Sequence, residues 1–110
     1  MIWRIRDHAT FQDLARARRW RRGPVAVRFL AVGSTGPPQV AYAVGRRVGG
    51  AVARNRARRR LRAAIRACRD QLVPGGAYLV SAGAPVVTMP FGTLVDALSD
   101  CLAAAERGSR

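Results

Sequence analysis

Residues 40–61 read VAYAVGRRVGGAVARNRARRRL, in which a short apolar run gives way to glycines and then to arginines. The apolar part has the composition of a β-strand, and the glycines allow the chain to turn before the arginines begin. Eight arginines lie between Arg54 and Arg69, with no acidic residue among them. A hydrophobic core requires no such density of charge, so we expect this segment to serve binding.

The spacing of apolar residues predicts that residues 53–68 form a helix with one buried face. These residues recur every three or four positions and cover about a third of the helix circumference, which is typical of a helix packed on a sheet. They are Ala53, Ala57, Leu61, Ala64, Ile65 and Cys68. The side chains that point away from this face are Arg58, Arg59, Arg62, Arg66 and Arg69, together with Asn55 and, on one flank, Arg56. We therefore expect the arginines to form a solvent-facing strip.

The residues before this segment predict one helix and two strands. Thr10 begins a capping-box pattern, and a helix over residues 11–20 ends before a Gly-Pro pair. Residues 25–32 (VAVRFLAV) and 39–44 (QVAYAV) are short and rich in β-branched residues, as strands are. Because only the turn sequence GSTGPP separates them, we expect these two strands to form a hairpin.

The residues after the arginine-rich helix predict a third strand and a final helix. Residues 77–82 (AYLVSA) have the composition of a strand, and a helix begins at about Pro90. Its apolar stripe consists of Leu94, Leu98, Cys101, Leu102 and Ala105. The order helix, strand, strand, helix, strand, helix predicts an α+β fold in which the helices pack on a small mixed sheet. We expect one domain over residues 1–107 and a disordered tail over residues 108–110.

The charge of the chain indicates the class of its partner. The 110 residues carry a net charge of +14, and all twenty basic residues are arginine. Self-repulsion on this scale is only a cost unless the chain binds a polyanion, most plausibly nucleic acid. The preference for arginine over lysine has two explanations that the sequence leaves open, which are bidentate phosphate binding and a coding bias.

The remaining residues offer no catalytic or metal-binding motif. His8 is the only histidine, the two cysteines lie 33 positions apart, and the six acidic residues are scattered. A zinc site, a nucleophilic triad and a pair of carboxylates for acid–base catalysis are therefore disfavoured. We expect Cys68 and Cys101 to be reduced core residues, with a disulfide as the less favoured alternative. Neither a signal peptide nor a membrane span is indicated, so we expect a cytoplasmic protein.

The basic strip itself is compatible with several partners. A merely solvated face usually mixes positive and negative charges, and a membrane-surface helix needs a bulkier apolar face than these alanines provide. DNA readers more often show a helix-turn-helix pair or dimer signals. RNA is favoured, because arginines beside an open sheet suit phosphate tracking and base stacking. The alternatives that remain are a ribosomal or general RNA-chaperone protein and a stand-alone nuclease.

The run from Val40 to Leu61 resembles the signature of the bacterial ribonuclease P protein component. The matching positions are Arg46, Arg47, Val48, Gly49, Ala51, Val52, Arg54, Asn55, Arg56, Arg58, Arg59, Leu61 and Arg62. The segment RIRD with Phe11, and the segment AYLVSA followed by an amphipathic helix, are similar to the beginning and end of that family. The resemblance spans roughly residues 3 to 106.

This resemblance implies a division of labour between protein and RNA. In that family a catalytic RNA removes the 5′ leader of precursor tRNA in a magnesium-dependent hydrolysis, and the protein supplies no catalytic residue. It implies that Mg²⁺ is held mainly by the RNA, and that the partners are the catalytic RNA and precursor tRNA, with neither DNA nor membrane. It also implies a left-handed crossover of the strands around the RNR helix, against the usual right-handed rule.

Site residues follow from the same resemblance. The residues implied to bind the catalytic RNA are Arg46, Arg47, Arg54, Asn55, Arg56, Arg58, Arg59 and Arg62. Those implied to line a leader cleft between the first helix and the sheet are Phe11, Arg28 and Tyr42. The chain departs from the family pattern at Ala15, where an aromatic residue is common, at Gly50, where asparagine is usual, and at Gly83, where an arginine is usual. An acidic residue usual before the third strand is replaced by Gly76 or Ala77.

Overall fold

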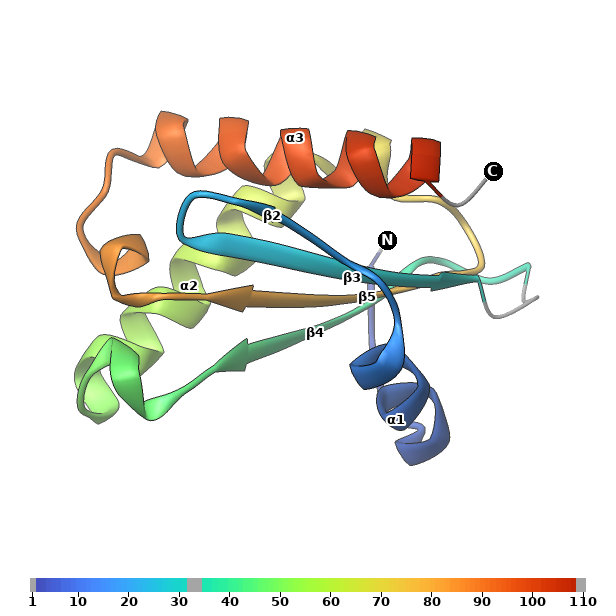
Figure 1. Cartoon of the computed structure of the whole chain (residues 1–110), viewed down its shortest axis with the longest axis horizontal. Helices are drawn as coiled ribbons and strands as arrows, with labels where there is room; N and C mark the ends of the chain where they lie inside the picture. The colour runs from blue at the N-terminus through green and yellow to red at the C-terminus, as the bar shows by residue number, and fades with distance from the viewer. Residues whose placement is uncertain (1, 32–34, 109–110) are drawn as a thin grey trace.

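A five-stranded mixed sheet forms the centre of the molecule (Figure 1). The computed structural model describes residues 2–31 and 35–108. The strands are β1 (Trp3–Arg4), β2 (Arg19–Arg22), β3 (Val25–Ala31), β4 (Gln39–Val44) and β5 (Gly76–Ala82), in the spatial order β1-β4-β5-β3-β2. β5 pairs in parallel with β4 and antiparallel with β3. The outer strands β1 and β2 extend the sheet, β1 parallel to β4 and β2 antiparallel to β3.

Three α-helices cover the two faces of this sheet. They are α1 (His8–Arg16), α2 (Ala51–Ala67) and α3 (Phe91–Gly108), and short 3₁₀ turns η1 (Arg46–Val48), η2 (Arg69–Gln71) and η3 (Ala84–Val87) lie at the connections. α2 and α3 pack together on one face, here called the α2 face, while α1 lies on the other, the α1 face (Figure 1). The sheet is therefore enclosed on both sides, although α1 covers its face only in part.

The alternation of side chains along the strands divides the core in two. On the α2 face, Val40 and Val44 of β4 join Tyr78 and Val80 of β5 in a large cluster with α2 and α3. On the α1 face, Ala77 and Leu79 of β5 pack with Leu14 of α1, and the neighbours Ala41 and Ala43 of β4 join them. Each residue of β4 is thus assigned to a face by its odd or even number.

The structure confirms the α+β fold, the three helices, the strand over residues 39–44 and the buried stripes of the last two helices. β4, α2 and β5 form the crossover that the family resemblance implies. Both strands run to the left in Figure 1, β5 lies above β4, and α2 lies behind them, so the connection is left-handed. Gly108 ends α3, and residues 109 and 110 of the expected tail lie outside the described residues.

Two predictions about the first half of the chain are wrong. The hairpin joins β2 to β3, not β3 to β4, because β5 inserts between the latter pair. The first helix begins after the N-cap residue Asp7, whose carboxylate accepts hydrogen bonds from Ala9 N and Thr10 Oγ1, and it ends at Arg16. Arg19 and Trp20, which the sequence predicts to be helical, belong to β2 instead. Of the expected turn over residues 33–38, only residues 35–38 are described.

Candidate nucleic-acid interface

Two glycines shape the entry to α2. Gly49 has a φ of 139°, and a Cβ atom there would lie 2.9 Å from the Cβ of Ala53, so the tight approach of η1 to the helix requires glycine. Gly50 is the N-cap and offers no side-chain hydrogen bond to the helix. Within η1, Val48 is buried, while Arg46 and Arg47 are exposed. The sharp entry therefore places two arginines beside the first turn of α2.

Four fully buried residues, Ala57, Leu61, Ala64 and Ile65, anchor α2 on the sheet. This anchoring confirms the predicted apolar face and fixes the directions of the arginines around it. The arginines of α2 point in three directions, toward η3, toward solvent and toward the edge of the sheet. The segment therefore does not present a single uniform strip.

One direction faces η3 and contains Arg56 and Arg60. Arg56 Nε donates to the carbonyl oxygen of Val87 at 3.0 Å, and Arg60 Nε donates to that of Val86 at 2.9 Å. Arg60 also donates to the carbonyl oxygen of Met89, and its guanidinium lies 6.0 Å from the ring centre of Phe91. Arg60 is half-buried, and it is not among the arginines that the helical spacing predicts to face solvent.

A second direction is open to solvent. Arg59 and Asn55 are exposed there, and Asn55 Oδ1 accepts a long hydrogen bond of 3.5 Å from Arg58. Arg54 is half-buried, and its Nε is shielded from solvent without a hydrogen-bond partner among the described residues. A shielded charged donor without an acceptor is unfavourable. An oxygen of a bound phosphate would satisfy it.

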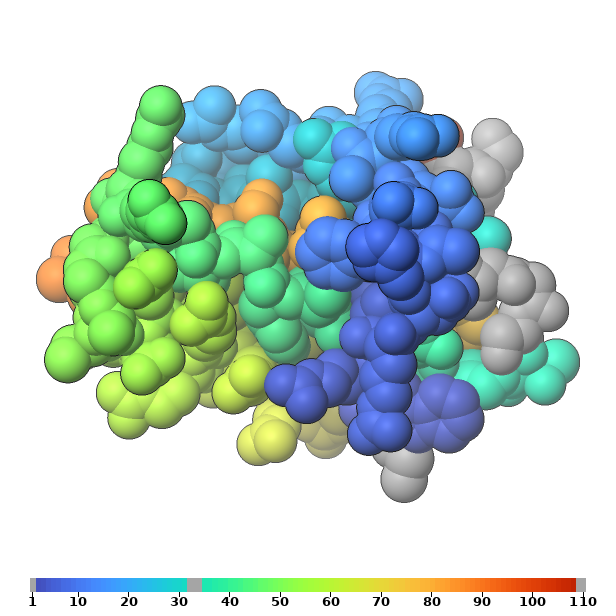
Figure 2. All heavy atoms as spheres, turned by 90° about the horizontal axis from the view of Figure 1, so that it is seen from below, coloured from blue at the N-terminus to red at the C-terminus, as the bar shows by residue number. Residues whose placement is uncertain are grey.

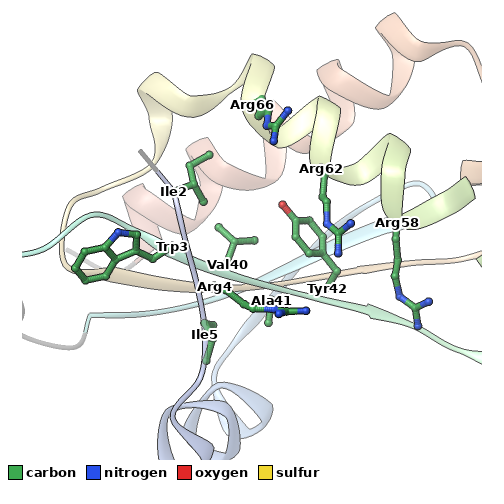
Figure 3. Close-up of a pocket in the computed structure, with 10 residues that line it drawn as sticks. All are labelled: Ile2, Trp3, Arg4, Ile5, Val40, Ala41, Tyr42, Arg58, Arg62 and Arg66. Carbon is green, nitrogen blue, oxygen red and sulfur yellow. The ribbon is translucent and has the colours of Figure 1, made fainter. Parts of the chain in front are cut away.

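A third direction faces the edge of the sheet, where Arg58, Arg62 and Arg66 line a groove, here called the β1–α2 groove (Figure 3). Its other walls are residues 2–5 and residues 40–42, and its volume is about 470 Å³. The guanidinium of Arg62 lies 5.7 Å from the ring centre of Tyr42, in the range of a cation–π contact. Burial raises the pKa of the Tyr42 phenol, and the nearby Arg62 and Arg66 oppose that rise.

The three residues expected to line a leader cleft do not share one face. Arg28 belongs to the α1 face, where it donates to the carbonyl oxygen of Ala17, and Phe11 of α1 is 41% exposed above the same face. Tyr42 follows Ala41 on β4 and therefore projects to the α2 face, into the β1–α2 groove. Figure 2 shows the α1 face, where α1 lies to one side and strand residues of β4 and β5 are visible in a shallow hollow beside it.

Few of the described arginines form an ion pair with a carboxylate of the same chain. Among residues 2–31 and 35–108, the one ion pair joins Arg22 Nε of β2 to Asp100 of α3 at 3.6 Å, and both side chains are largely exposed. No α2 arginine pairs with a carboxylate within the described residues. The positive charge of α2 and η1 is thus not balanced by a carboxylate in an ion pair among the described residues.

The sequence of the chain is similar to those of known proteins. The sequence profile of the family described as Ribonuclease P matches residues 2–106. The chain belongs to the ribonuclease P protein family. The ribonuclease P protein component of Symbiobacterium thermophilum is 34% identical over 93 residues, which are 84% of this chain and 81% of that protein. The ribonuclease P protein component of Ruegeria pomeroyi is 37% identical over 102 residues, which are 89% of this chain and 82% of that protein.

Solved structures of the ribonuclease P family share the fold. The RNase P protein of Staphylococcus aureus superposes with a TM-score of 0.78 at 20% identity, covering 94% of this chain and 95% of that one. The RNase P protein from Thermotoga maritima gives a TM-score of 0.77 at 20% identity, covering 90% of this chain and 94% of that one. These structures show a shared fold, and membership of the ribonuclease P protein family makes the chain an RNA-binding ribonucleoprotein subunit with a role in tRNA processing.

Within residues 2–31 and 35–108, no three side chains of the types His, Cys, Asp or Glu gather closely enough to hold a metal ion. A divalent cation prefers several carboxylate or carbonyl oxygens, and arginines dominate the charged surface here. In that described part of the chain, no helix is long and apolar enough to cross a membrane.

Sequence reasoning missed several residues of this interface. Arg66 stands four positions after Arg62 and eight after Arg58, and that helical spacing was available to place it in the same groove. Trp3 carries no motif, and the likeness of the RIRD segment to the family gave Arg4 no role in a site. Both residues reach the groove only because β1 pairs with β4. The bonds of Arg60 to η3 had no signal in the sequence, since their acceptors lie 26 and 29 positions further along the chain.

Proposed function

We propose that this chain binds the catalytic RNA of ribonuclease P through η1 and α2, and thereby promotes magnesium-dependent removal of the 5′ leader from precursor tRNA. The main support for the proposal is that α2 is packed on the sheet by a fully buried face. Its buried face is fully anchored, while its arginines have no carboxylate partner among the described residues. The side chains proposed to contact this RNA are Arg46, Arg47, Arg54, Asn55, Arg56, Arg58, Arg59 and Arg62.

Individual contacts support different roles within that set. Arg54 has a shielded donor in need of an acceptor, and Arg59 is free to reach a phosphate. Arg56 uses Nε on Val87, so only its terminal nitrogens remain for RNA. Asn55 both donates and accepts hydrogen bonds, whereas the arginines only donate. A surface with such mixed chemistry favours one folded RNA over any polyanion.

We further propose that the α1 face holds the leader, with Phe11 stacking on a base and Arg28 close to the backbone. Phe11 is a large exposed apolar side chain beside strands that α1 covers only in part (Figure 2). Base stacking on aromatic rings is tolerant of sequence, as a leader that varies between tRNAs requires. Tyr42 projects to the α2 face, so we do not include it in the proposed leader surface.

Magnesium enters the proposal through the RNA. The described residues do not fit a cation site, so RNA phosphates would hold the Mg²⁺ ions that activate water for hydrolysis. The chain's own contribution is to lower the repulsion between two packed RNAs with its positive charge, which lessens the magnesium needed to hold them together.

The test is cleavage of precursor tRNA by the cognate RNA subunit at low magnesium, with and without the chain. We expect the chain to raise the rate, and Arg59→Gln to require more protein for the same effect. Arg107→Gln is a matched control, since it removes the same charge from an exposed position in the last turn of α3. An unchanged rate with the wild-type chain would favour a general RNA chaperone.

A second measurement separates the leader surface from the RNA-docking surface. Phe11→Ala should weaken binding of precursor tRNA to the holoenzyme while leaving the affinity for leaderless tRNA unchanged. Phe91→Ala removes a comparably exposed ring, 42% exposed, from the start of α3 and serves as the control. Equal losses for precursor and leaderless tRNA would contradict the assignment of Phe11 to the leader.

A further inference from the structure

The β1–α2 groove has a shape suited to a ligand. Residues 2–5 form one wall, α2 forms the other, and Val40 and Tyr42 of β4 lie between them (Figure 3). Its volume of about 470 Å³ falls in the range of about 300–1,000 Å³ that is usual for ligand pockets. The groove lies at the β1 edge of the sheet, where Val40 and Tyr42 line it from the α2 face and Ile5 and Ala41 line it from the α1 face. Phe11 and Arg28, which we assign to the leader, are not among its lining residues.

The charge of the groove selects an anionic ligand. Four arginines line it, Arg4 from β1 and Arg58, Arg62 and Arg66 from successive turns of α2, and no acidic residue is among the lining side chains. Arginines one helical turn apart are about 6 Å from each other along the helix, close to the spacing of consecutive phosphates in an extended strand. The row on α2 therefore matches a single backbone in spacing as well as in sign.

The aromatic side chains of the groove add a second requirement. The ring of Tyr42 is half-buried beside the guanidinium of Arg62, and Trp3 at the other end is 46% exposed (Figure 3). Planar guanidinium and aromatic groups both stack on nucleobases. A duplex hides the faces of its bases and presents only backbone and groove edges, so it cannot use these planar groups.

We propose that the β1–α2 groove binds unpaired nucleotides of RNA, with a base stacked at Tyr42 and Arg62 and adjoining phosphates on Arg58 and Arg66. This inference deepens the proposed function and rests on its conclusion that the partner is RNA. It adds a site for single-stranded RNA to a surface otherwise assigned to docking of a folded RNA. The chain thereby distinguishes unpaired from paired segments of its partner.

The first test measures binding of the full chain to a labelled eight-nucleotide oligoadenylate and to a short blunt-ended RNA duplex. We expect Tyr42→Leu to lose about tenfold or more in affinity for the oligomer, from the usual strength of base stacking, and Tyr42→Phe to retain it. Phe91→Leu, which removes an exposed ring outside the groove, is the control and should bind like the wild type. Binding of the duplex should change little in all three variants.

The second test measures the fluorescence of a tryptophan that lines the groove. In a Trp20→Phe variant, Trp3 is the only tryptophan, and oligoadenylate should quench its fluorescence while an octaglutamate peptide of similar charge should not. Equal response to the peptide would overturn the base-stacking site and leave a generic anion site. Full oligomer affinity in a folded Tyr42→Leu variant would overturn it as well.

These outcomes remain distinct from failure of the proposed function. If Tyr42→Leu binds oligoadenylate normally and the wild-type chain still stimulates cleavage, the groove assignment is wrong and the proposed function stands. If the wild-type chain does not bind the catalytic RNA at all, the proposed function itself is wrong. Circular dichroism melting of each variant establishes that a loss of binding is not a loss of folding, and Tyr42→Phe keeps the test decisive if the leucine variant is unstable.

Discussion

Arg60 donates from Nε to the carbonyl oxygen of Val86 at 2.9 Å, and this bond ties the middle of α2 to the turn that leads into α3. Arg60→Met should therefore lower the free energy of unfolding by about 1.5–3 kcal/mol, the usual range for a hydrogen bond to a charged group. Arg59→Met, one position earlier and exposed, should change it by less than about 0.5 kcal/mol. Urea unfolding followed by circular dichroism measures both.

The same pair of variants should separate stability from RNA binding. We expect Arg59→Met to weaken binding to the catalytic RNA at a temperature where both variants are folded, because its guanidinium is free for phosphate. Arg60→Met should bind nearly as well as the wild type, because its guanidinium is engaged with η3 and Phe91. A larger loss of RNA affinity for Arg60→Met than for Arg59→Met would contradict this division of roles.

The affinity for the catalytic RNA should fall steeply with salt. Each phosphate that an arginine neutralises releases bound counterions, which gives a slope of about 0.7–0.9 log units of affinity per log unit of salt for each contact. Arg59→Gln should reduce the magnitude of that slope by about one contact. Filter binding or fluorescence anisotropy across a range of salt concentrations measures the slope, and a nearly flat response would refute an electrostatic interface.

The two adjacent glycines at the start of α2 should respond in opposite ways to substitution. Gly49→Ala forces a φ of 139° on a residue with a side chain and crowds Ala53, so we expect a loss of more than about 1 kcal/mol of stability. Gly50→Asn has open space and extended backbone, and it adds an N-cap side chain, so we expect a gain of about 0.5 kcal/mol. Thermal melting tests both, and stabilisation by Gly49→Ala would refute the backbone argument.

Stability should decline in alkaline solution as the thiols begin to titrate. Burial raises the pKa of Cys68 and of Cys101 above the ordinary value of 9.0, so the unfolded chain releases these protons at lower pH than the folded chain does. The folded state then holds more protons, and its stability falls as the pH rises through about 9. Tyr42 and Tyr78, whose pKa values burial also raises, extend the decline above pH 10.

Cysteine variants isolate the contribution of the thiols to this pH dependence. A Cys68→Ala, Cys101→Ala double variant should be less stable at neutral pH, because it leaves space in the core, but its stability should change less between pH 7 and pH 9.5. Urea unfolding at several pH values measures the difference. An unchanged pH slope in the double variant would show that other groups cause the decline.

The parts of the fold that the sequence predicts correctly are those with a strong internal period. The buried stripes of α2 and α3 repeat over several turns, and residues 39–44 have the composition and length of a strand. β1 has only two residues, and β2 has the sequence RWRR, which has no strand-like apolar alternation. Both are strands because a neighbouring strand offers free backbone donors and acceptors, a property of tertiary pairing that local composition does not record.

The candidate site was predictable to the extent that it follows the helical wheel. The wheel separates Leu61 from Arg59, and exposure in the structure agrees with that separation. It does not reveal what approaches the flanks of the helix, and so the fixing of Arg60 by η3 was not predicted. The placement of Tyr42 depends on the pairing of β4 with β5 and on which face α1 occupies, and neither is encoded near Tyr42.

The central position of β5 has a consequence for how the molecule is built during synthesis. β3 and β4 have no hydrogen-bonded contact with each other, and both depend on β5, whose residues leave the ribosome only after α2 has been made. Contacts between such distant segments form slowly, since a long loop must close first. A nascent chain that ends before Gly76 carries all the arginines of α2 but no completed sheet to hold them. The fixed orientation of α2, on which the RNA binding that we propose for this helix depends, is thus reached only after β5 has been made.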